Sequence, residues 1–167
     1  MSRYRASFVL KDGTVVAYPF LKREKEAKEK NRDLDTSVLK SPRGWRVIAI
    51  AARGAHTFTL ERDSKDKQRQ IKCQTGDGST QLLEIEGIKT DTLIDRIFPG
   101  DECLILLYQD NTFHLVRDGS VVAGWSDFLQ TALGDHYGKA VQDVHVGGLF
   151  CLIRFMGGRI FCVRKLN

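Results

Sequence analysis

A seven-residue phrase occurs twice in this chain. Lys11-Asp12-Gly13-Thr14-Val15-Val16-Ala17 returns as Arg117-Asp118-Gly119-Ser120-Val121-Val122-Ala123, with only Lys-to-Arg and Thr-to-Ser changes. An Asp-Gly pair is typical of a tight hairpin turn, because glycine adopts positive φ without a steric penalty, and the valines that follow favour a strand. Two copies of one turn-and-strand phrase indicate an internal repeat, so we expect the two turns to be equivalent.

Short strand-like segments, separated by turn residues, fill most of the chain. The turns recur about every eight to twelve residues, a spacing typical of sandwiches, barrels and propellers. We therefore predict an all-β fold of repeated antiparallel sheets with one or two short helices. The expected strands are residues 6–10, 14–20, 45–52, 57–62, 68–74, 81–86, 93–98, 102–108, 112–117, 144–147, 149–155 and 159–164.

The hairpins themselves have a longer period. Those expected near Asp12, Asp63, Asp110 and Gly157 lie roughly fifty residues apart. That interval fits both a propeller blade and a β-trefoil lobe. The chain holds about three and a half propeller-like repeats in a single domain over residues 1–167, and a β-trefoil is the alternative.

Residues 21–44 interrupt the strand pattern. Their first part alternates in charge, and acidic residues precede lysines by four positions, as Glu24 precedes Lys28. This spacing favours helical ion pairs, so we predict a solvated helix or charged linker inserted over 21–44.

A second helix is expected after the second copy of the phrase. Ser126 can cap its amino end, and Gly134 stands where a left-handed terminating residue belongs. Its apolar stripe consists of Phe128, Leu129, Ala132 and Leu133.

Several of these pieces resemble the regulator-of-chromosome-condensation propeller family. The resemblance lies in Gly54-Ala55-His56-Thr57 followed by Leu60, in the Asp-Gly-x-Val phrase, and in Trp125 followed by Leu133-Gly134. It implies a docking scaffold, since members act mostly as scaffolds, some as exchange factors for small GTPases or as chromatin binders. A complete propeller of the family has seven blades, which this chain could reach by forming a homodimer; a trefoil would stay monomeric.

The composition indicates which classes of partner the chain favours. Basic residues number 26 and acidic residues 21, so the net charge of +5 is a mild excess that favours acidic partners. No apolar run approaches the roughly 20 residues that cross a bilayer, and the amino end leads into a strand. We therefore expect no membrane association, and an intracellular protein, cytoplasmic or nuclear.

The chain shows no motif of catalysis or of metal or cofactor binding. The four cysteines have no Cys-x-x-Cys spacing, and the four histidines are scattered. Phosphate-loop and nucleophile-elbow motifs are also missing from the sequence. We predict no catalytic residues, no metal and no cofactor.

Basic and aromatic residues alternate in the last hairpin, a pattern that can hold phosphates and stack on bases. It equally describes a strand whose aromatic side chains point inward and whose arginines face water. The leading prediction is a non-enzymatic protein-interaction module or scaffold. The alternative is nucleic acid or ribonucleoprotein binding through this basic C-terminal hairpin. The candidate partner-binding residues are Trp125, His136, Tyr137, Arg154, Arg159, Arg164 and Lys165.

Overall fold

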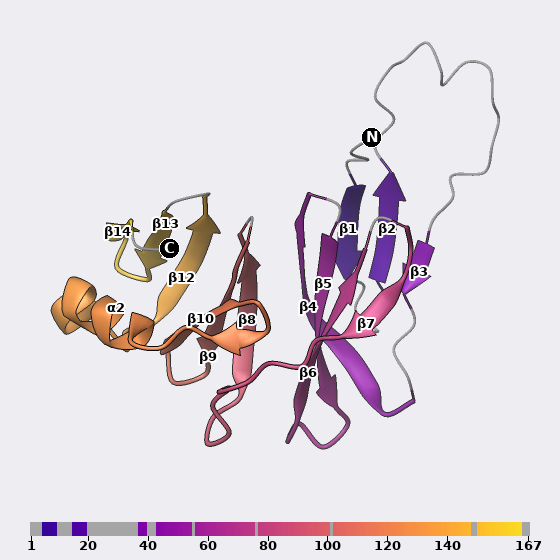
Figure 1. The fold of residues 1–167 in the computed structure, drawn as a ribbon, viewed down its shortest axis with the longest axis horizontal. Helices are drawn as coiled ribbons and strands as arrows, with labels where there is room; N and C mark the ends of the chain where they lie inside the picture. Colours follow the sequence, from indigo (N-terminus) through magenta and orange to yellow (C-terminus); the bar gives the residue numbers. More distant parts are fainter. Residues whose placement is uncertain are drawn as a thin grey trace, which may run out of the picture. The chain divides into compact units, whose positions relative to one another are not determined.

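The computed structural model (Figure 1) describes residues 5–9, 15–19, 37–39, 43–54, 56–75, 77–100, 102–147 and 150–164. The chain divides into two compact units, residues 1–82 and 83–167, and each unit is considered by itself below. The expectation of a single domain over residues 1–167 stays a prediction. The expectation of a mostly β fold is confirmed, since the described residues form four antiparallel sheets and one short α-helix.

The first unit contains two sheets, one with the strand order β1-β2-β3 and one with the order β4-β5-β6-β7. β1 contacts β4. In the second sheet, Val47, Leu60 and Ile71 are buried, and Leu60 pairs with Ile71 across β5 and β6. The strands are β1 (Arg5–Val9), β2 (Val15–Pro19), β3 (Ser37–Leu39), β4 (Trp45–Arg53), β5 (His56–Asp63), β6 (Arg69–Gln74) and β7 (Thr80–Leu82).

Strand β3 corrects one expectation. It pairs with β2 and lies inside the predicted linker or helix of residues 21–44, so that interpretation is wrong for residues 37–39. The charged residues 21–35 lie outside the described part of the chain. The expected strand at residues 81–86 is also shorter than predicted, because β7 ends at Leu82.

The second unit contains a four-stranded sheet with the order β11-β10-β9-β8 and a three-stranded sheet with the order β12-β13-β14. All five side chains of β9 are buried, and this strand is hydrogen-bonded to a neighbour on each side. The elements are β8 (Ile94–Pro99), β9 (Leu104–Tyr108), β10 (Phe113–Arg117), β11 (Ser120–Val121), α2 (Trp125–Leu133), the 3-10 helix η1 (Gly134–His136), β12 (Val141–Val146), β13 (Cys151–Phe155) and β14 (Ile160–Val163).

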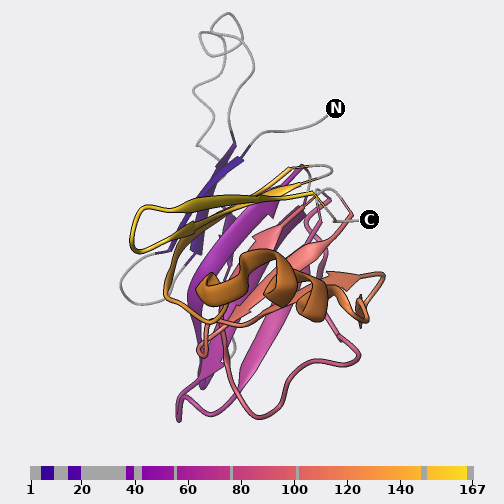
Figure 2. The same ribbon diagram turned by 90° about the vertical axis from the view of Figure 1, so that its left-hand side faces the viewer.

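Helix α2 covers one side of the second unit (Figure 2) and contacts β10 and β14. It buries Trp125, Leu129 and Leu133, which stand four residues apart and therefore on one face. Ala132, expected on that face, is exposed, so this part of the predicted stripe is wrong.

Both ends of α2 differ in part from expectation. The N-cap position is Gly124, with φ of 72°, and Ser126 lies inside the first turn. The Ser126 hydroxyl donates to the Phe113 carbonyl at 2.8 Å, so it fastens the helix to β10 and does not cap it. At the other end Gly134 follows the last helical residue, which confirms its predicted place, but its φ of 51° and ψ of -127° are not the expected left-handed conformation.

Three of the four sheets carry the same irregularity between their first and second strands. The register skips one residue at Ile48 in β4, at Asp95 in β8 and at Gln142 in β12, and these positions are 47 residues apart. A β-bulge of this kind bends its strand and increases its twist. A bulge that returns at one spacing indicates a structural repeat of 47 residues.

The pairs beside the bulges keep the same spacing. Buried Val47, Ile94 and Val141 precede the three bulges. They pair with Glu61, Tyr108 and Phe155, which are again 47 residues apart. The hairpins expected near Asp63, Asp110 and Gly157 are confirmed, and each joins the second strand of its sheet to the third.

The repeated Asp-Gly phrase does not mark this repeat. Its second copy is a two-residue turn between Arg117 and Ser120, with positive φ at Asp118 and Gly119. The two copies begin 106 residues apart, at Lys11 and Arg117, which is not a multiple of 47. The turn of the first copy lies in residues 10–14, outside the described residues. The expectation that the two turns are equivalent stays a prediction.

Arg96 connects two bulges within the second unit. It follows the bulge residue of β8, and its guanidinium donates to the carbonyls of Val141 at 2.6 Å and Gln142 at 2.9 Å. Gln142 is the bulge residue of β12, and a bulge leaves its extra residue outside the regular hydrogen-bond ladder between β12 and β13. The arginine satisfies these carbonyls and fixes β8 against β12.

Gly100, directly after β8, lies where a side chain would not fit. A Cβ on Gly100 would lie 2.6 Å from the Cys103 sulfur and 2.8 Å from a Val146 methyl carbon. We expect Gly100→Ala to lower the free energy of unfolding by about 1–3 kcal/mol, because overpacking forces neighbouring atoms to shift. Gly157→Ala is the matched control, since nothing lies within 4 Å of its Cβ position. Urea denaturation of both variants checks this, and equal stabilities would contradict it.

Candidate functional site

The β13–β14 hairpin turns over residues 155–159. The Phe155 amide donates to the Arg159 carbonyl, and the Gly158 amide donates to the Phe155 carbonyl, both at 2.9 Å. Gly158 has φ of 81°, a conformation that glycine adopts without the penalty a side chain would bring. The Gly157-Gly158 pair thus allows a short turn that projects Met156 and Arg159.

A pocket of about 520 Å³ opens beside this turn. The Met156 amide donates to the Ala140 carbonyl at 3.0 Å, which holds the turn against the segment between η1 and β12. The lining residues are Asp135, His136, Lys139, Ala140, Phe155, Met156, Gly157 and Arg159.

His136 and Arg159 meet at the wall of the pocket. A guanidinium nitrogen of Arg159 lies 3.0 Å from His136 Nε2. Arginine can only donate, so the imidazole nitrogen Nε2 is the acceptor in this contact. The His136 ring also packs against Phe155 and Phe161, at centroid distances of 5.8 and 5.0 Å. The aromatic contacts orient the imidazole, and the imidazole in turn holds the arginine.

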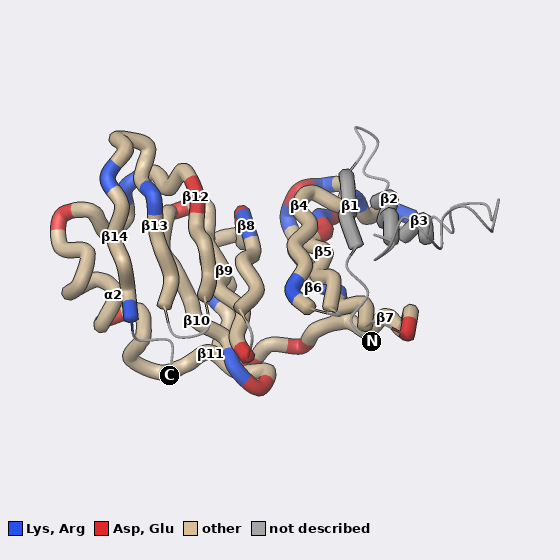
Figure 3. Tube along the Cα trace, turned by 90° about the horizontal axis from the view of Figure 1, so that it is seen from above, with Lys and Arg blue, Asp and Glu red and all other residues tan. Residues whose placement is uncertain are grey.

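The hairpin carries exposed apolar and basic side chains together. Met156 is 67% exposed and Ile160 is 62% exposed, and they are two of four large apolar residues exposed in the described part of the chain. Arg154, Arg159 and Arg164 are exposed as well, and Figure 3 shows basic residues along β13 and β14. Exposed apolar side chains rimmed by charge are typical of interaction surfaces. We call these five residues the hairpin surface.

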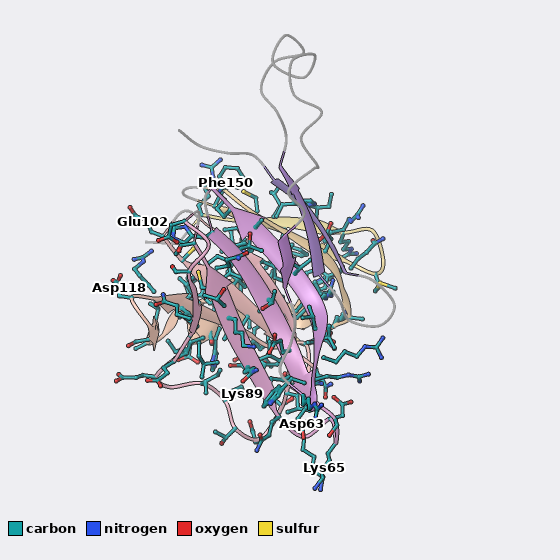
Figure 4. All side chains as sticks on the ribbon, turned by 90° about the vertical axis from the view of Figure 1, so that its right-hand side faces the viewer. Asp63, Lys65, Lys89, Glu102, Asp118 and Phe150 are labelled. Carbon is teal, nitrogen blue, oxygen red and sulfur yellow. The ribbon has the colours of Figure 1, made fainter. Side chains whose placement is uncertain are left out.

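Phe150, also exposed, is not part of the hairpin surface. It precedes β13 whereas Met156 follows it, so the two stand at opposite ends of that strand. In Figure 4, Phe150 lies toward the same end of the second unit as Glu102, and Lys89 lies toward the other end.

Two of the predicted partner-binding residues contribute to the hydrophobic core of the second unit. Trp125 is only 4% exposed and belongs to the hydrophobic core, so its assignment to partner binding is wrong. Tyr137 is half-buried and packs against that core. Burial raises the pKa of Tyr137, although a hydrogen bond with the Phe113 backbone opposes the shift.

The other predicted residues have different outcomes. His136 and Arg159 are brought together in the pocket. Arg154 lies 3.9 Å from Asp143 on β12, across the sheet. Arg164 is exposed just after β14, and Lys165 lies outside the described residues. Sequence reasoning missed Met156 and Lys139; a methionine directly before Gly-Gly is a signal for the former, and nothing local marks the latter.

A second polar cluster lies around the β9–β10 hairpin. Lys89 Nζ lies 2.7 Å from Asp110 Oδ2, and the buried Tyr108 hydroxyl lies 3.1 Å from His114 Nδ1. Burial raises the pKa of Tyr108 and lowers that of His114. These contacts fasten the segment before β8 to the hairpin, and we assign the cluster a structural role.

Neither a metal site nor a membrane span emerges from the residues that the structure describes. No three side chains among them gather as possible metal ligands. None of their helices has the length and apolar character to cross a membrane.

No known protein family has a model that matches this chain, and no curated protein matches it either.

The half-buried position of His114 has a consequence for its pKa. Burial disfavours its charged form, and the nearby Lys89 acts in the same direction, so its pKa in the folded protein lies below the ordinary value of about 6.5. The stability that follows from this shift is present above the unfolded pKa and is lost as pH falls through the folded pKa. An NMR titration of the His114 ring should give a midpoint below 6.5, and a midpoint at or above that value would contradict this prediction.

Proposed function

We propose that this chain is a non-enzymatic protein-interaction module that binds a protein partner through the hairpin surface. The observation that carries the proposal is the joint exposure of Met156 and Ile160 among three arginines, next to a pocket. Aromatic, methionine and arginine side chains are the types enriched where proteins meet. The rigid hairpin holds these side chains in place before a partner arrives, which lowers the ordering cost of binding.

The fold supports a scaffold role. In each four-stranded sheet every strand pairs with its neighbours in the sequence, and the bulges return after 47 residues. Consecutive four-stranded meanders are the pattern of propeller blades, so we favour a propeller-type repeat over a trefoil. The resemblance to regulator-of-chromosome-condensation propellers and the expected homodimer stay predictions.

Nucleic acid binding is the second candidate, favoured by the three arginines of the hairpin. Base stacking, however, needs exposed aromatic faces. Phe155 is 3% exposed, and Phe161 packs against the core, so both rings are engaged inside the unit. The hairpin surface has cations but no described aromatic platform, which favours a protein partner.

Met156→Asp tests the proposed function. A carboxylate in place of this exposed methionine should reduce partner recovery about tenfold, because a central apolar anchor contributes more than 1 kcal/mol to binding. The measurement is quantitative affinity capture with and without nuclease. Leu82→Asp is the matched control, since Leu82 is 53% exposed and belongs to the other unit.

A partner that survives nuclease and is lost only with Met156→Asp supports the proposal. Recovery that nuclease abolishes would favour the nucleic acid alternative. Equal losses with the two aspartate variants would contradict a role for the hairpin surface.

A further inference from the structure

Among the described strands, the last sheet has no counterpart of the fourth strand that the 47-residue repeat has in the two sheets before it. β6, β10 and β14 are each the third strand of their sheet. A fourth strand pairs with the outer edge of β6 and of β10, as β7 and β11 respectively. No described strand pairs with the outer edge of β14.

The backbone of β14 has hydrogen-bonding groups directed at that edge. In an antiparallel pair, alternate residues exchange both bonds with the neighbouring strand, and the residues between them point to the other side. Phe155 donates to Arg159, so Phe161 and Val163 are the residues that bond to β13. The amides and carbonyls of Ile160 and Cys162 therefore point outward.

The equivalent position in the preceding sheet shows how such a group is satisfied. Leu115 of β10 lies 47 residues before Cys162 and also alternates with the residues that bond to the second strand. Its carbonyl accepts the Val122 amide at 2.8 Å, from the residue that follows β11. The same edge of β14 has no described counterpart, and an exposed edge of this kind is a template for pairing with another chain.

The side chains along this edge are apolar in the middle of β14 and positively charged at its ends. Ile160 and Cys162 are exposed, whereas Val163 is buried and Phe161 packs against the core. Arg159 and Arg164 lie at the two ends of the strand, and both are exposed. An added strand therefore meets an apolar middle with a positive charge at each end.

These charges disfavour a second copy of the chain at the same edge. If two β14 strands paired antiparallel about Phe161, Ile160 of one copy would lie opposite Cys162 of the other, and Arg159 and Arg164 of both copies would gather along one strand pair. Like charges brought together in this way disfavour the pairing. An acidic strand would instead place carboxylates beside both arginines.

We propose that β14 binds an acidic, extended peptide segment of a partner protein, which adds antiparallel as the fourth strand of the sheet. Main-chain hydrogen bonds to Ile160 and Cys162 would give affinity, and the flanking arginines would select acidic residues. This inference rests on the proposed function and adds to it the mode of binding and the chemistry of the partner.

Binding of fluorescent peptides to the full chain tests the proposal. The probe has a centre of valines flanked by two glutamates at each end; a second peptide has lysines in place of the glutamates, and a third is the acidic peptide with alternate amides N-methylated. We expect the acidic peptide alone to bind, and its affinity to fall as salt rises, since exposed charges are screened. Binding of the methylated peptide with equal affinity would overturn strand addition.

Two sets of variants locate the binding site. Ile160→Pro removes an outward amide without touching the bonds to β13, so it should weaken binding at least about tenfold. Arg159→Glu with Arg164→Glu should have a similar effect through charge. Lys65→Glu is the control, because Lys65 is exposed on the β5–β6 hairpin of the first unit (Figure 4). If Ile160→Pro unfolds the chain, the arginine variants and the methylated peptide still decide.

The remaining outcomes separate the two proposals. Failure of all peptides to bind, while Met156→Asp still abolishes partner capture, would overturn strand addition and leave the proposed function standing. Sedimentation could instead show a dimer that Ile160→Pro dissociates. That result would assign the edge of β14 to a second copy of the chain and overturn the proposal that it binds an acidic peptide. Equal binding of the acidic and basic peptides would overturn the selection by charge.

Discussion

The interrupted register between first and second strands is the constraint on which the rest of the structure depends. A single skipped residue at Ile48, Asp95 or Gln142 shifts every later pair in the first strand by one position. Because side chains alternate between the two faces of a sheet, this shift decides which residues enter the core. In the second unit, Arg96 holds two of these bulges together through the carbonyls of Val141 and Gln142.

From that register follow the core and then the hairpin surface. The bulge in β12 sets the pairing of Val141 with Phe155 and of Val144 with Ile153, all four of which are buried. With Phe155 turned inward, the next residue, Met156, is left at the tip of the hairpin and exposed. The same alternation continues into β14, where Ile160 faces solvent. The exposed apolar side chains are a consequence of strand geometry, and a partner is what would cover them.

The strands could be predicted from sequence because their boundaries are chemical. Pro99-Gly100, Asp110-Asn111 and Gly157-Gly158 are turn residues with known backbone preferences, and a strand ends at or within two residues before each pair. The repeat could not be found in the same way. The bulge residues are an isoleucine, an aspartate and a glutamine, which share no property, and the aliphatic residues before them resemble those of any strand. The Asp-Gly phrase was misleading because a tight turn says only that a hairpin is present, and not where it lies in a sheet.

The candidate site was predicted in part for similar reasons. Alternation of basic and apolar residues in the last hairpin is a local signal, and it led to Arg154, Arg159 and Arg164. The contact between Arg159 and His136 joins residues 23 positions apart, and it depends on how η1 packs against the hairpin. The prediction that Trp125 lies at a surface failed for a different reason. The sequence does not say which face of α2 meets the core, and in the structure Trp125 lies on the buried face.

Amide hydrogen exchange along β14 tests the central claim most directly. β14 is the third strand of its sheet and no described strand pairs with its outer edge, so only the amides that face β13 are hydrogen-bonded within the sheet. In the free protein, the Phe161 and Val163 amides should exchange slowly, and the Ile160 and Cys162 amides should exchange at rates close to those of an unprotected chain. Equal protection of all four amides would contradict the account, because it would mean that another strand already covers this edge.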